Sequence, residues 1–201
     1  MTKPLTLLEL SNANPRAVSL ADATVVVIDA QREYVDGFLV LPGVDEALQD
    51  IHALLTRARR ATTPIVHIQH AGAPGGAFDP QGPGFAFAPG AEPHADEPVV
   101  QKNLPDAFAG TNLEDILQGF GRTSLLIVGF MTHMCVTSTT HSARSRGFAN
   151  TIIARATATR ALPGAQGGVI DDVSLKQVSL SGLADFFAVV VEDTAAIADQ
   201  P

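Results

Sequence analysis

Short apolar runs alternate with stretches of helical periodicity along most of this chain, and this alternation limits the possible folds more than any other feature. The run from Thr24 to Asp29 is β-branched and apolar on both faces, as in parallel strands that are covered on both sides. Further strands are predicted at residues 64–70, 98–101, 124–128, 151–154 and 187–191. Helical spacing is found at residues 44–60, 111–117, 132–146 and 169–183. The pattern predicts the α/β class, with a six-stranded, mostly parallel sheet between two layers of helices.

The length of 201 residues predicts a single domain, which we place at residues 21–201 behind an N-terminal arm at residues 1–20. Within the domain, residues 71–97 consist almost entirely of Gly, Pro, Ala, Phe and acidic residues. A segment of that length without regular structure is usually an active-site loop or a disordered stretch. Because it contains Phe78, Phe85 and Phe87, we expect an ordered loop that packs against the domain.

Charge and hydropathy exclude several classes of protein. The chain has 13 basic and 21 acidic residues, a net charge of -8 and no basic patch, so no nucleic-acid partner is expected. No apolar run approaches the roughly 20 residues that span a bilayer. The N-terminus also lacks the pattern of a signal peptide, so we expect a cytoplasmic protein without a membrane partner. A dinucleotide-binding glycine motif and a P-loop are both missing, so no nucleotide cofactor is implied.

Chemically active side chains follow the predicted strands. Asp29 ends the first strand and His70 the second, while Lys102 follows the third and Cys135 the fourth. Working residues of α/β proteins gather beyond the carboxyl ends of the strands, so these side chains are expected to converge. A thiol can attack, a carboxylate can take its proton, and an ammonium can stabilise negative charge. Taken singly, a lone cysteine is most often a small buried hydrophobe, and a lysine a solvated charge.

The only cysteine of the chain, Cys135, comes shortly after an apolar run that ends at Gly129. The predicted helix begins at about Thr132, which places the thiol in its first turn. The partial positive charge of a helix N-terminus favours a thiolate and lowers the pKa of a cysteine. We therefore expect an easily ionised thiol at Cys135.

Several segments together resemble the isochorismatase-like cysteine hydrolases, a superfamily that includes nicotinamidase and N-carbamoylsarcosine amidohydrolase. They are Asp29-Ala30-Gln31, Pro42-Gly43, Val100-Gln101-Lys102, Phe108-Ala109-Gly110-Thr111-Asn112-Leu113, Gly129-Phe130-Met131-Thr132-His133-Met134-Cys135-Val136 and Arg146-Gly147-Phe148. The resemblance extends from about Ala23 to Val191. Its most specific part is the Gly-x-x-Thr-x-x-Cys-Val segment.

The resemblance implies a Rossmann-type, isochorismatase-like fold with strand order 3-2-1-4-5-6. It implies a catalytic triad of Asp29, Lys102 and Cys135, and a cis peptide bond between Phe130 and Met131. The backbone amides of Met131 and Cys135 would form an oxyanion hole. The implied substrate-binding side chains are Gln31, Tyr34, His70, Phe108, Phe130 and Thr132. The family also implies a homo-oligomer, either a dimer or a tetramer.

The implied reaction is hydrolysis of a small, mostly apolar, neutral amide-like substrate through a thioester, without a cofactor. Nicotinamidases resemble one another in a metal site with an Asp-x-His motif near the second strand. Here residues 67–70 read His-Ile-Gln-His, while Asp79 and His94 lie in the following loop at unrelated spacing. We therefore expect no structural metal.

Two other functions stay open on the same fold. Isochorismatases cleave a vinyl ether and need not use the cysteine, so a vinyl ether hydrolase is the first alternative. A non-catalytic small-molecule-binding or redox-sensing protein that uses the same pocket is the second. An intact set of Asp29, Lys102 and Cys135 favours C–N hydrolysis over both.

Overall fold

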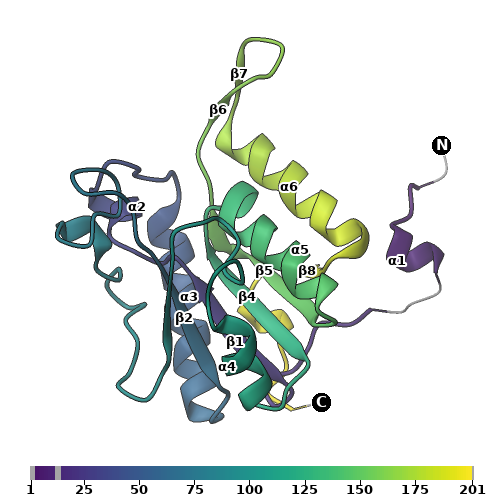
Figure 1. Ribbon diagram of the computed structural model, residues 1–201. Coiled ribbons are helices and arrows are strands. Elements are labelled where there is room, and N and C mark those ends of the chain that lie inside the picture. The colour runs from purple at the N-terminus through teal and green to yellow at the C-terminus, as the bar shows by residue number, and fades with distance from the viewer. Residues whose placement is uncertain (1–2, 12–14, 201) are drawn as a thin grey trace.

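The structure, a computed structural model, describes residues 3–11 and 15–200 and contains a six-stranded sheet (Figure 1). Its strands are β1 (Ala23–Ile28), β2 (Ile65–His70), β3 (Val99–Lys102), β4 (Ser124–Phe130), β5 (Ala149–Ala158) and β8 (Val189–Val191). They lie in the order β3-β2-β1-β4-β5-β8, and each neighbouring pair is parallel. Because β8 is the sixth strand of this sheet along the chain, the predicted class and strand order are confirmed.

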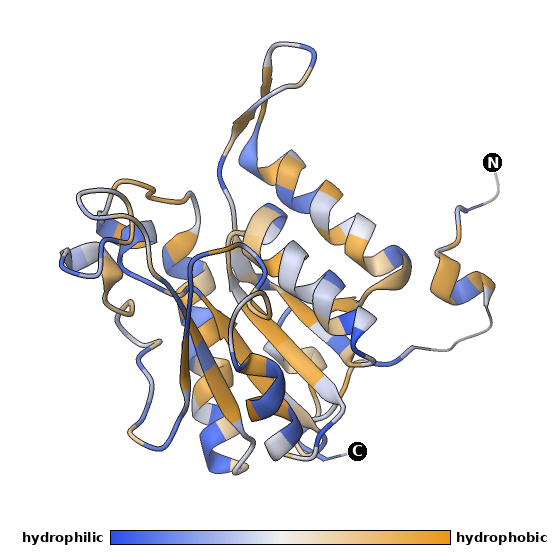
Figure 2. Ribbon diagram, viewed as in Figure 1, coloured by the Kyte–Doolittle hydropathy of each residue, from blue (hydrophilic) through white to orange (hydrophobic). Residues whose placement is uncertain are grey.

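Alternating side chains of the strands divide the core between the two faces of the sheet. On β1, Val25 and Val27 pack on one face, whereas Val26 and Ile28 pack on the other. The helix that covers the first face is α3 (Val44–Arg60). Those that cover the second face are α4 (Leu113–Gly119), α5 (Thr137–Ser145) and α6 (Asp172–Phe186). Figure 2 shows the apolar strands between these helices, which form the predicted αβα layers.

Shorter elements complete the described chain. On the N-terminal arm, α1 (Leu7–Leu10) lies beside α6, and the Leu7 N–H donates to a carboxylate oxygen of Asp185 at 2.8 Å. The elements α2 (Glu33–Asp36) and two 3-10 turns (Pro83–Phe85 and Thr194–Ala196) contribute single turns. Among the described helices, none combines the length and the apolar character that a membrane span requires.

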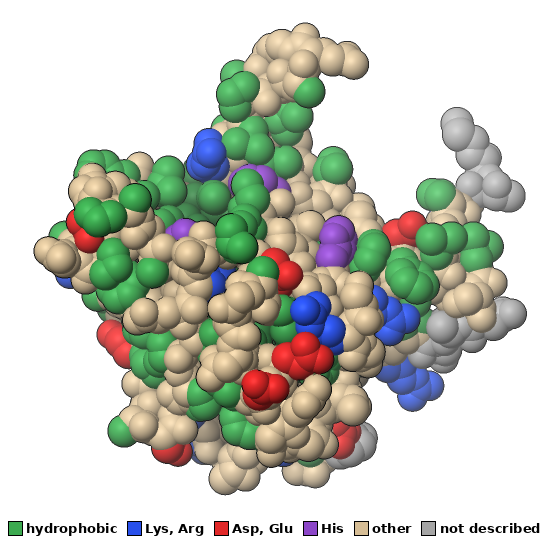
Figure 3. All heavy atoms as spheres, in the orientation of Figure 1, with side chains coloured by type: hydrophobic (Ala, Val, Ile, Leu, Met, Phe, Trp, Pro, Cys, Tyr) green, Lys and Arg blue, Asp and Glu red, His purple; other side chains and the backbone are tan. Residues whose placement is uncertain are grey.

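The predicted helix at residues 169–183 is wrong in its first residues. Val169–Ile170 forms β7, which pairs with β6 (Leu162–Pro163) in an antiparallel hairpin. This hairpin projects from the body and carries hydrophobic side chains on its surface (Figure 3). The helix begins only at Asp172, because the side chain of Asp171 accepts the Ser174 N–H and caps it.

The apolar side chains of α6 do not all face the sheet. Val173 and Val178 are 68% and 69% exposed, whereas Leu180 and Leu183 are buried against the sheet. The spacing of apolar residues thus predicts a helix here, but it does not show which of them the helix buries.

The start of α4 has no capping box, although Thr111 and Glu114 have the spacing of one. The residue that precedes the helix is Asn112, and its side chain makes no capping hydrogen bond. The Thr111 hydroxyl accepts the Leu113 N–H at 3.2 Å, which forms a local turn. The Glu114 carboxylate accepts from Nε of Arg146 at 2.9 Å and does not cap the first turn of α4.

The helix predicted at residues 132–146 begins differently from an ordinary α-helix. Its first turn, Thr132–Val136, is π-helical, and α5 follows directly. The fifth strand is also longer than predicted, since β5 extends to Ala158 after a shift in register between Ile127 and Gly129. Both differences lie beside Cys135.

The 71–97 segment is an ordered loop that packs on the domain, as expected. Phe78 is buried, with 6% of its surface exposed. Phe87 forms an isolated antiparallel bridge with Gln31, and the Phe85 carbonyl accepts a hydrogen bond from the Gln31 side chain at 2.9 Å. The loop is thereby attached to the residues that directly follow β1.

Candidate active site

Three strand ends bring the predicted triad to one edge of the sheet. Asp29 directly follows β1, Lys102 is the last residue of β3, and Cys135 lies in the π-helical turn after β4. β1 and β4 are neighbours in the middle of the sheet, and the chain continues from β1 toward one edge and from β4 toward the other. Asp29 and Cys135 therefore flank the point at which the strand order reverses. Ligands of open α/β sheets bind at this position.

The chain between β4 and Cys135 has an unusual backbone. Gly129 has a φ of 115°, and a Cβ there would lie 2.0 Å from the Ile28 carbonyl oxygen, so this close approach to β1 requires glycine. The Phe130–Met131 peptide bond is cis, which confirms the expectation. Thr132 then anchors the π-helical turn, because its hydroxyl donates to the Ala158 carbonyl at 3.1 Å.

The Lys102 ammonium joins the other members of the triad. Its Nζ lies 2.7 Å from Oδ2 of Asp29 and 3.4 Å from Sγ of Cys135. It lies 3.1 Å from Nδ1 of His70 as well. Asp29, Lys102 and Cys135 are 0%, 3% and 5% exposed, so the charges interact in a site with little water. The structure thus brings together the three side chains that the sequence placed at separate strand ends.

The Cys135 thiol is harder to ionise than its place at a helix start led us to expect. Burial raises its pKa to about 12, with the negative charge of Asp29 as a second cause, while Lys102 acts in the opposite direction. Loss of water around the sulfur disfavours the thiolate, and the turn that holds Cys135 is π-helical. The direction of this shift is opposite to the one expected from a helix start, and a thiol with a raised pKa needs a base.

Asp29 is placed to act as that base. Its backbone N–H donates to the Ile68 carbonyl at 3.1 Å, and its φ of 49° turns the chain away from the strand direction. Burial raises the pKa of its carboxyl group, and the charge of Lys102 opposes this shift. Oδ2 accepts from Lys102, but Oδ1 is buried and has no hydrogen-bond partner among the described residues. Oδ1 is thus available to take a proton.

Aromatic side chains line the base of the site. The Tyr34 ring packs edge-on against Phe78 and Phe130, with ring centroids 5.1 Å and 5.6 Å away. Burial raises the pKa of the Tyr34 phenol, and the nearby Asp29 raises it further, so the phenol is neutral. Tyr34 and Phe130 are among the predicted substrate-binding residues, and this binding role stays a prediction.

Gln31 has a structural use for its side-chain amide. Its Nε2 donates to the carbonyls of His70 and Phe85, at 3.0 Å and 2.9 Å, and its Oε1 accepts the His70 N–H at 2.8 Å. The amide therefore holds the end of β2 and the 71–97 loop together. Its predicted contact with substrate stays a prediction, as does that of Thr132.

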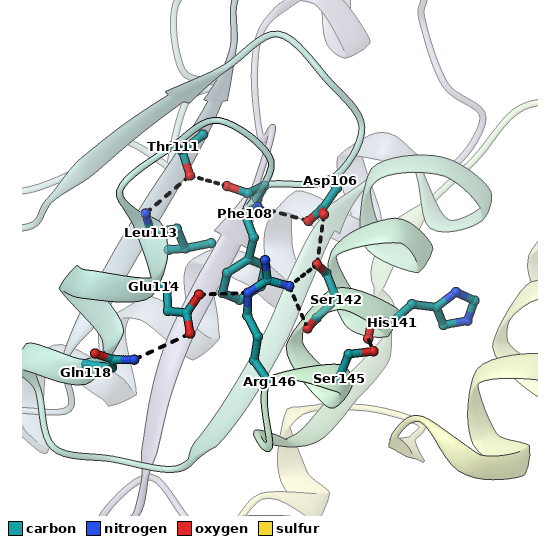
Figure 4. Close-up of polar contacts among 11 residues, drawn as sticks. Asp106, Phe108, Thr111, Leu113, Glu114, Gln118, His141, Ser142, Ser145 and Arg146 are labelled. Carbon is teal, nitrogen blue, oxygen red and sulfur yellow. Dashed lines mark hydrogen bonds and ion pairs between the residues drawn. The ribbon is translucent and has the colours of Figure 1, made fainter.

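Phe108 lies in the loop that links Lys102 to α4, and a polar network holds this loop against α5 (Figure 4). The Arg146 guanidinium lies over the Phe108 ring, 4.6 Å from its centroid, and also donates to Glu114. Asp106 accepts the Phe108 N–H at 2.9 Å and the Ser142 hydroxyl at 2.8 Å. Phe108 is thus packed within the loop, and its predicted contact with substrate stays untested.

The histidines do not share one site. His70 contacts Lys102, whereas Nε2 of His67 lies 2.9 Å from Oε2 of Glu97, and the backbone N–H of His94 donates to the same oxygen. Within residues 3–11 and 15–200, no group of three or more His, Cys, Asp or Glu side chains could hold a metal ion. The expected lack of a structural metal stays a prediction.

Two side chains near the site were missed from the sequence. Arg160 follows β5, and its positive charge, after burial, lowers the pKa of His133. Its Nε is buried and has no hydrogen-bond partner among the described residues. Glu33 is buried and accepts the N–H groups of Phe38 and Phe78. The predicted end of the fifth strand at residue 154 left Arg160 outside the site. The segment before it, Arg155-Ala156-Thr157-Ala158-Thr159, is not an apolar run that would have extended the predicted strand.

Comparisons with known proteins agree with this geometry. The isochorismatase domain model matches residues 23–195. A secreted isochorismatase effector of Verticillium dahliae is 34% identical, over 88% of this chain and 91% of its own length. Streptothricin hydrolase of Streptomyces noursei is 37% identical, over 71% of this chain and 57% of its own length.

Solved structures show the same relationship. An isochorismatase from Pseudomonas putida KT2440 superposes with a TM-score of 0.93 at 40% identity, over 97% of this chain and 100% of that one. N-carbamoylsarcosine amidase from Thermoplasma acidophilum shares the fold, with a TM-score of 0.74 at 22% identity over 85% of this chain and 96% of that one. Since the domain match covers most of its length, this chain belongs to the isochorismatase family.

Proposed function

We propose that this isochorismatase-family hydrolase cleaves a C–N bond of a small amide-like compound, with Cys135 as the nucleophile. One observation carries the proposal: the Lys102 ammonium lies 2.7 Å from Asp29 Oδ2 and 3.4 Å from Cys135 Sγ. A buried thiol, a carboxylate with an open oxygen and a fixed cation are the groups that nucleophilic hydrolysis needs. They also agree with the hydrolase named among the relatives.

Acylation begins when Asp29 takes the proton from Sγ as the sulfur attacks the carbonyl carbon of the substrate. The C–S bond forms, and the electron pair of the carbonyl moves onto its oxygen. The amides of Met131 and Cys135 are the proposed donors to this oxyanion, and one such donor contributes roughly 3 kcal/mol in other hydrolases. Asp29 then gives its proton to the leaving nitrogen, the C–N bond breaks, and a thioester with Cys135 is left.

Deacylation reverses the roles with water as the nucleophile. Asp29 takes a proton from water as the oxygen attacks the thioester carbon. The C–S bond breaks, the acid is released, and Asp29 returns the proton to the sulfur. Lys102 stays charged throughout and stabilises whichever of the two neighbours, carboxylate or thiolate, carries the negative charge.

The raised pKa of Cys135 decides the order of these events. With a pKa of about 12, almost none of the thiol is ionised at neutral pH. Proton transfer to Asp29 must therefore accompany attack on the substrate, since no stored thiolate is present to react. The same burial that disfavours the thiolate makes an ionised sulfur, once formed, a strong nucleophile.

A screen of small amides, ureas and carbamoyl compounds for ammonia release tests the proposal. Cys135→Ala and Cys135→Ser should lose at least about a thousandfold of the activity, because neither side chain supplies a thiol. Mass spectrometry of the wild-type protein, quenched during turnover, should show an acyl group on Cys135. Full activity of Cys135→Ala on an amide would refute the thiol mechanism.

The same variants separate the two alternatives. A vinyl ether hydrolase that does not use the thiol would keep its activity in Cys135→Ala and lose it in Asp29→Asn. A binding or redox-sensing protein would turn over neither class of compound. We further propose a small molecule as the binding partner and a dimer or tetramer in solution, which size-exclusion chromatography with light scattering would test.

A further inference from the structure

His70 lies directly beside the buried triad and is less buried than its members. Its Nδ1 lies 3.1 Å from the Lys102 Nζ. The side chain of Lys102 is itself fully buried, whereas His70 is only partly buried. Among the described residues, no hydrogen bond involves the His70 Nε2 atom. One ring nitrogen therefore contacts the triad, and the other is left without a hydrogen-bond partner in the described part of the chain.

The lysine decides where the proton of this imidazole lies. A lysine ammonium has three N–H donors and no acceptor. Its three neighbours here are Oδ2 of Asp29, Sγ of Cys135 and Nδ1 of His70. Since the ammonium can only donate, Nδ1 of His70 must accept, and a neutral imidazole then carries its proton on Nε2.

The surroundings of the His70 imidazole favour its neutral form. Burial lowers the pKa of His70, and the positive charge of Lys102 on β3, against Nδ1, lowers it further, to about 4. Asp29 and Cys135 lie on the far side of the ammonium, which is hydrogen-bonded to both. On the loop side the ring packs edge-on against Phe78, an uncharged side chain, at 5.1 Å between centroids.

We propose that Lys102 fixes His70 as the Nε2–H tautomer, and that this N–H selects substrates with a hydrogen-bond acceptor beside the scissile carbonyl. The inference rests on the proposed function, since it defines the substrate of that site. It predicts that an ether or carbonyl oxygen next to the cleaved amide improves binding, whereas a methylene or an N–H group at that place weakens it. His70 then contributes to specificity, while Asp29 and Cys135 carry the chemistry.

The tautomer can be measured without any substrate. Two-bond 1H–15N spectra of the labelled protein distinguish a protonated from an unprotonated ring nitrogen, and a His70→Gln sample assigns the signals. At pH 7 we expect Nδ1 unprotonated and Nε2 protonated, with no titration above pH 5. An Nδ1–H tautomer, or titration near pH 6.5, would overturn the inference.

Selectivity is tested with methoxyacetamide and butyramide, which differ only in an ether oxygen in place of a methylene group. The assay is protection of the single thiol, Cys135, from iodoacetamide, so it does not require turnover. We expect methoxyacetamide to protect about 5- to 10-fold more tightly in the wild type, the effect of one hydrogen bond. Equal protection by the two amides would refute the selection by His70.

Two variants divide the roles of the ring nitrogens. In His70→Asn the side-chain oxygen can replace Nδ1 as the acceptor for Lys102, but nothing replaces the Nε2–H. The preference for methoxyacetamide should vanish, while the pH dependence of Cys135 alkylation stays the same. In His70→Gln the amide reaches the place of Nε2, so the preference should return in part. A preference for methoxyacetamide that persists in His70→Asn contradicts the inference. If the screen for ammonia release fails while the preference in the protection assay is present, only the proposed hydrolysis is refuted.

Discussion

Asp29→Asn should stop turnover and yet make the Cys135 thiol more reactive. Asp29 Oδ2 and Cys135 Sγ lie 2.7 Å and 3.4 Å from the same nitrogen, so they are at most about 6 Å apart. At that distance, and with an effective dielectric constant of about 20, two unit charges repel by about 2.8 kcal/mol. This energy corresponds to about two pKa units. Removing the carboxylate charge should therefore lower the pKa of Cys135 from about 12 to about 10.

The rate of alkylation by iodoacetamide at pH 8 measures this change. A pKa lower by two units raises the thiolate fraction about 100-fold, while the intrinsic nucleophilicity of the thiolate falls about 10-fold. The net expectation is alkylation about 10-fold faster than in the wild type. Turnover should fall by at least about 100-fold, because the general base is lost.

Two controls make the result specific. Cys135 is the only cysteine, so Cys135→Ala gives the background of the labelling assay. Asp45→Asn removes an exposed carboxylate from the first turn of α3 and should change neither rate. Alkylation of Asp29→Asn that is unchanged or slower would show that no negative charge of Asp29 opposes the thiolate. The electrostatic account of the site would then be wrong.

Two further predictions concern stability. A Cβ at Gly84 would lie 2.2 Å from Oε2 of the buried Glu33, so Gly84→Ala should lower the free energy of unfolding by about 1–3 kcal/mol. In the control Gly119→Ala the Cβ meets nothing within 4 Å, so the free energy of unfolding should stay the same or rise. Equal urea midpoints for the two variants would contradict the packing argument. Burial lowers the pKa of His67 below that of an unfolded histidine, so the unfolded chain binds the proton first and stability should fall as the pH drops below about 6.5. In His67→Gln the slope of unfolding free energy between pH 7.5 and 5.5 should be smaller, and a slope equal to that of the wild type would count against His67 as its cause.

The fold was predictable where buried strands leave a direct trace in the sequence. The run at Ala23–Ile28 is apolar apart from Thr24, because β1 is buried on both faces, and the order of the strands followed from the family resemblance. Glycine at residue 129 is likewise readable in hindsight, since the close approach to β1 permits no side chain. The apolar run is a local pattern, whereas the approach of Gly129 to Ile28 depends on the pairing of two strands that are far apart in the chain.

Other features could not be predicted, because they depend on which surface a segment packs against. Val173 and Val178 lie in a segment of predicted helix but face solvent, since Leu180 and Leu183 supply the buried face of α6. In the same way, the sequence does not show that the Gln31 amide joins β2 to the 71–97 loop. Hydrogen-bond partners of a polar side chain are chosen by the folded surroundings.

The sequence of this protein determined which groups react and which strand ends carry them, because strand boundaries are set by local patterns of apolar residues. It did not determine the protonation states of these groups. Asp29 and Lys102 are 73 residues apart in the chain and meet only after the sheet has formed. Burial then raises the pKa of Cys135, and contact with Lys102 directs the proton of His70, two effects that reverse or refine what the sequence indicated. Desolvation and Coulomb energies depend on distances in space, so the fold determines the chemistry of side chains that the sequence had already supplied.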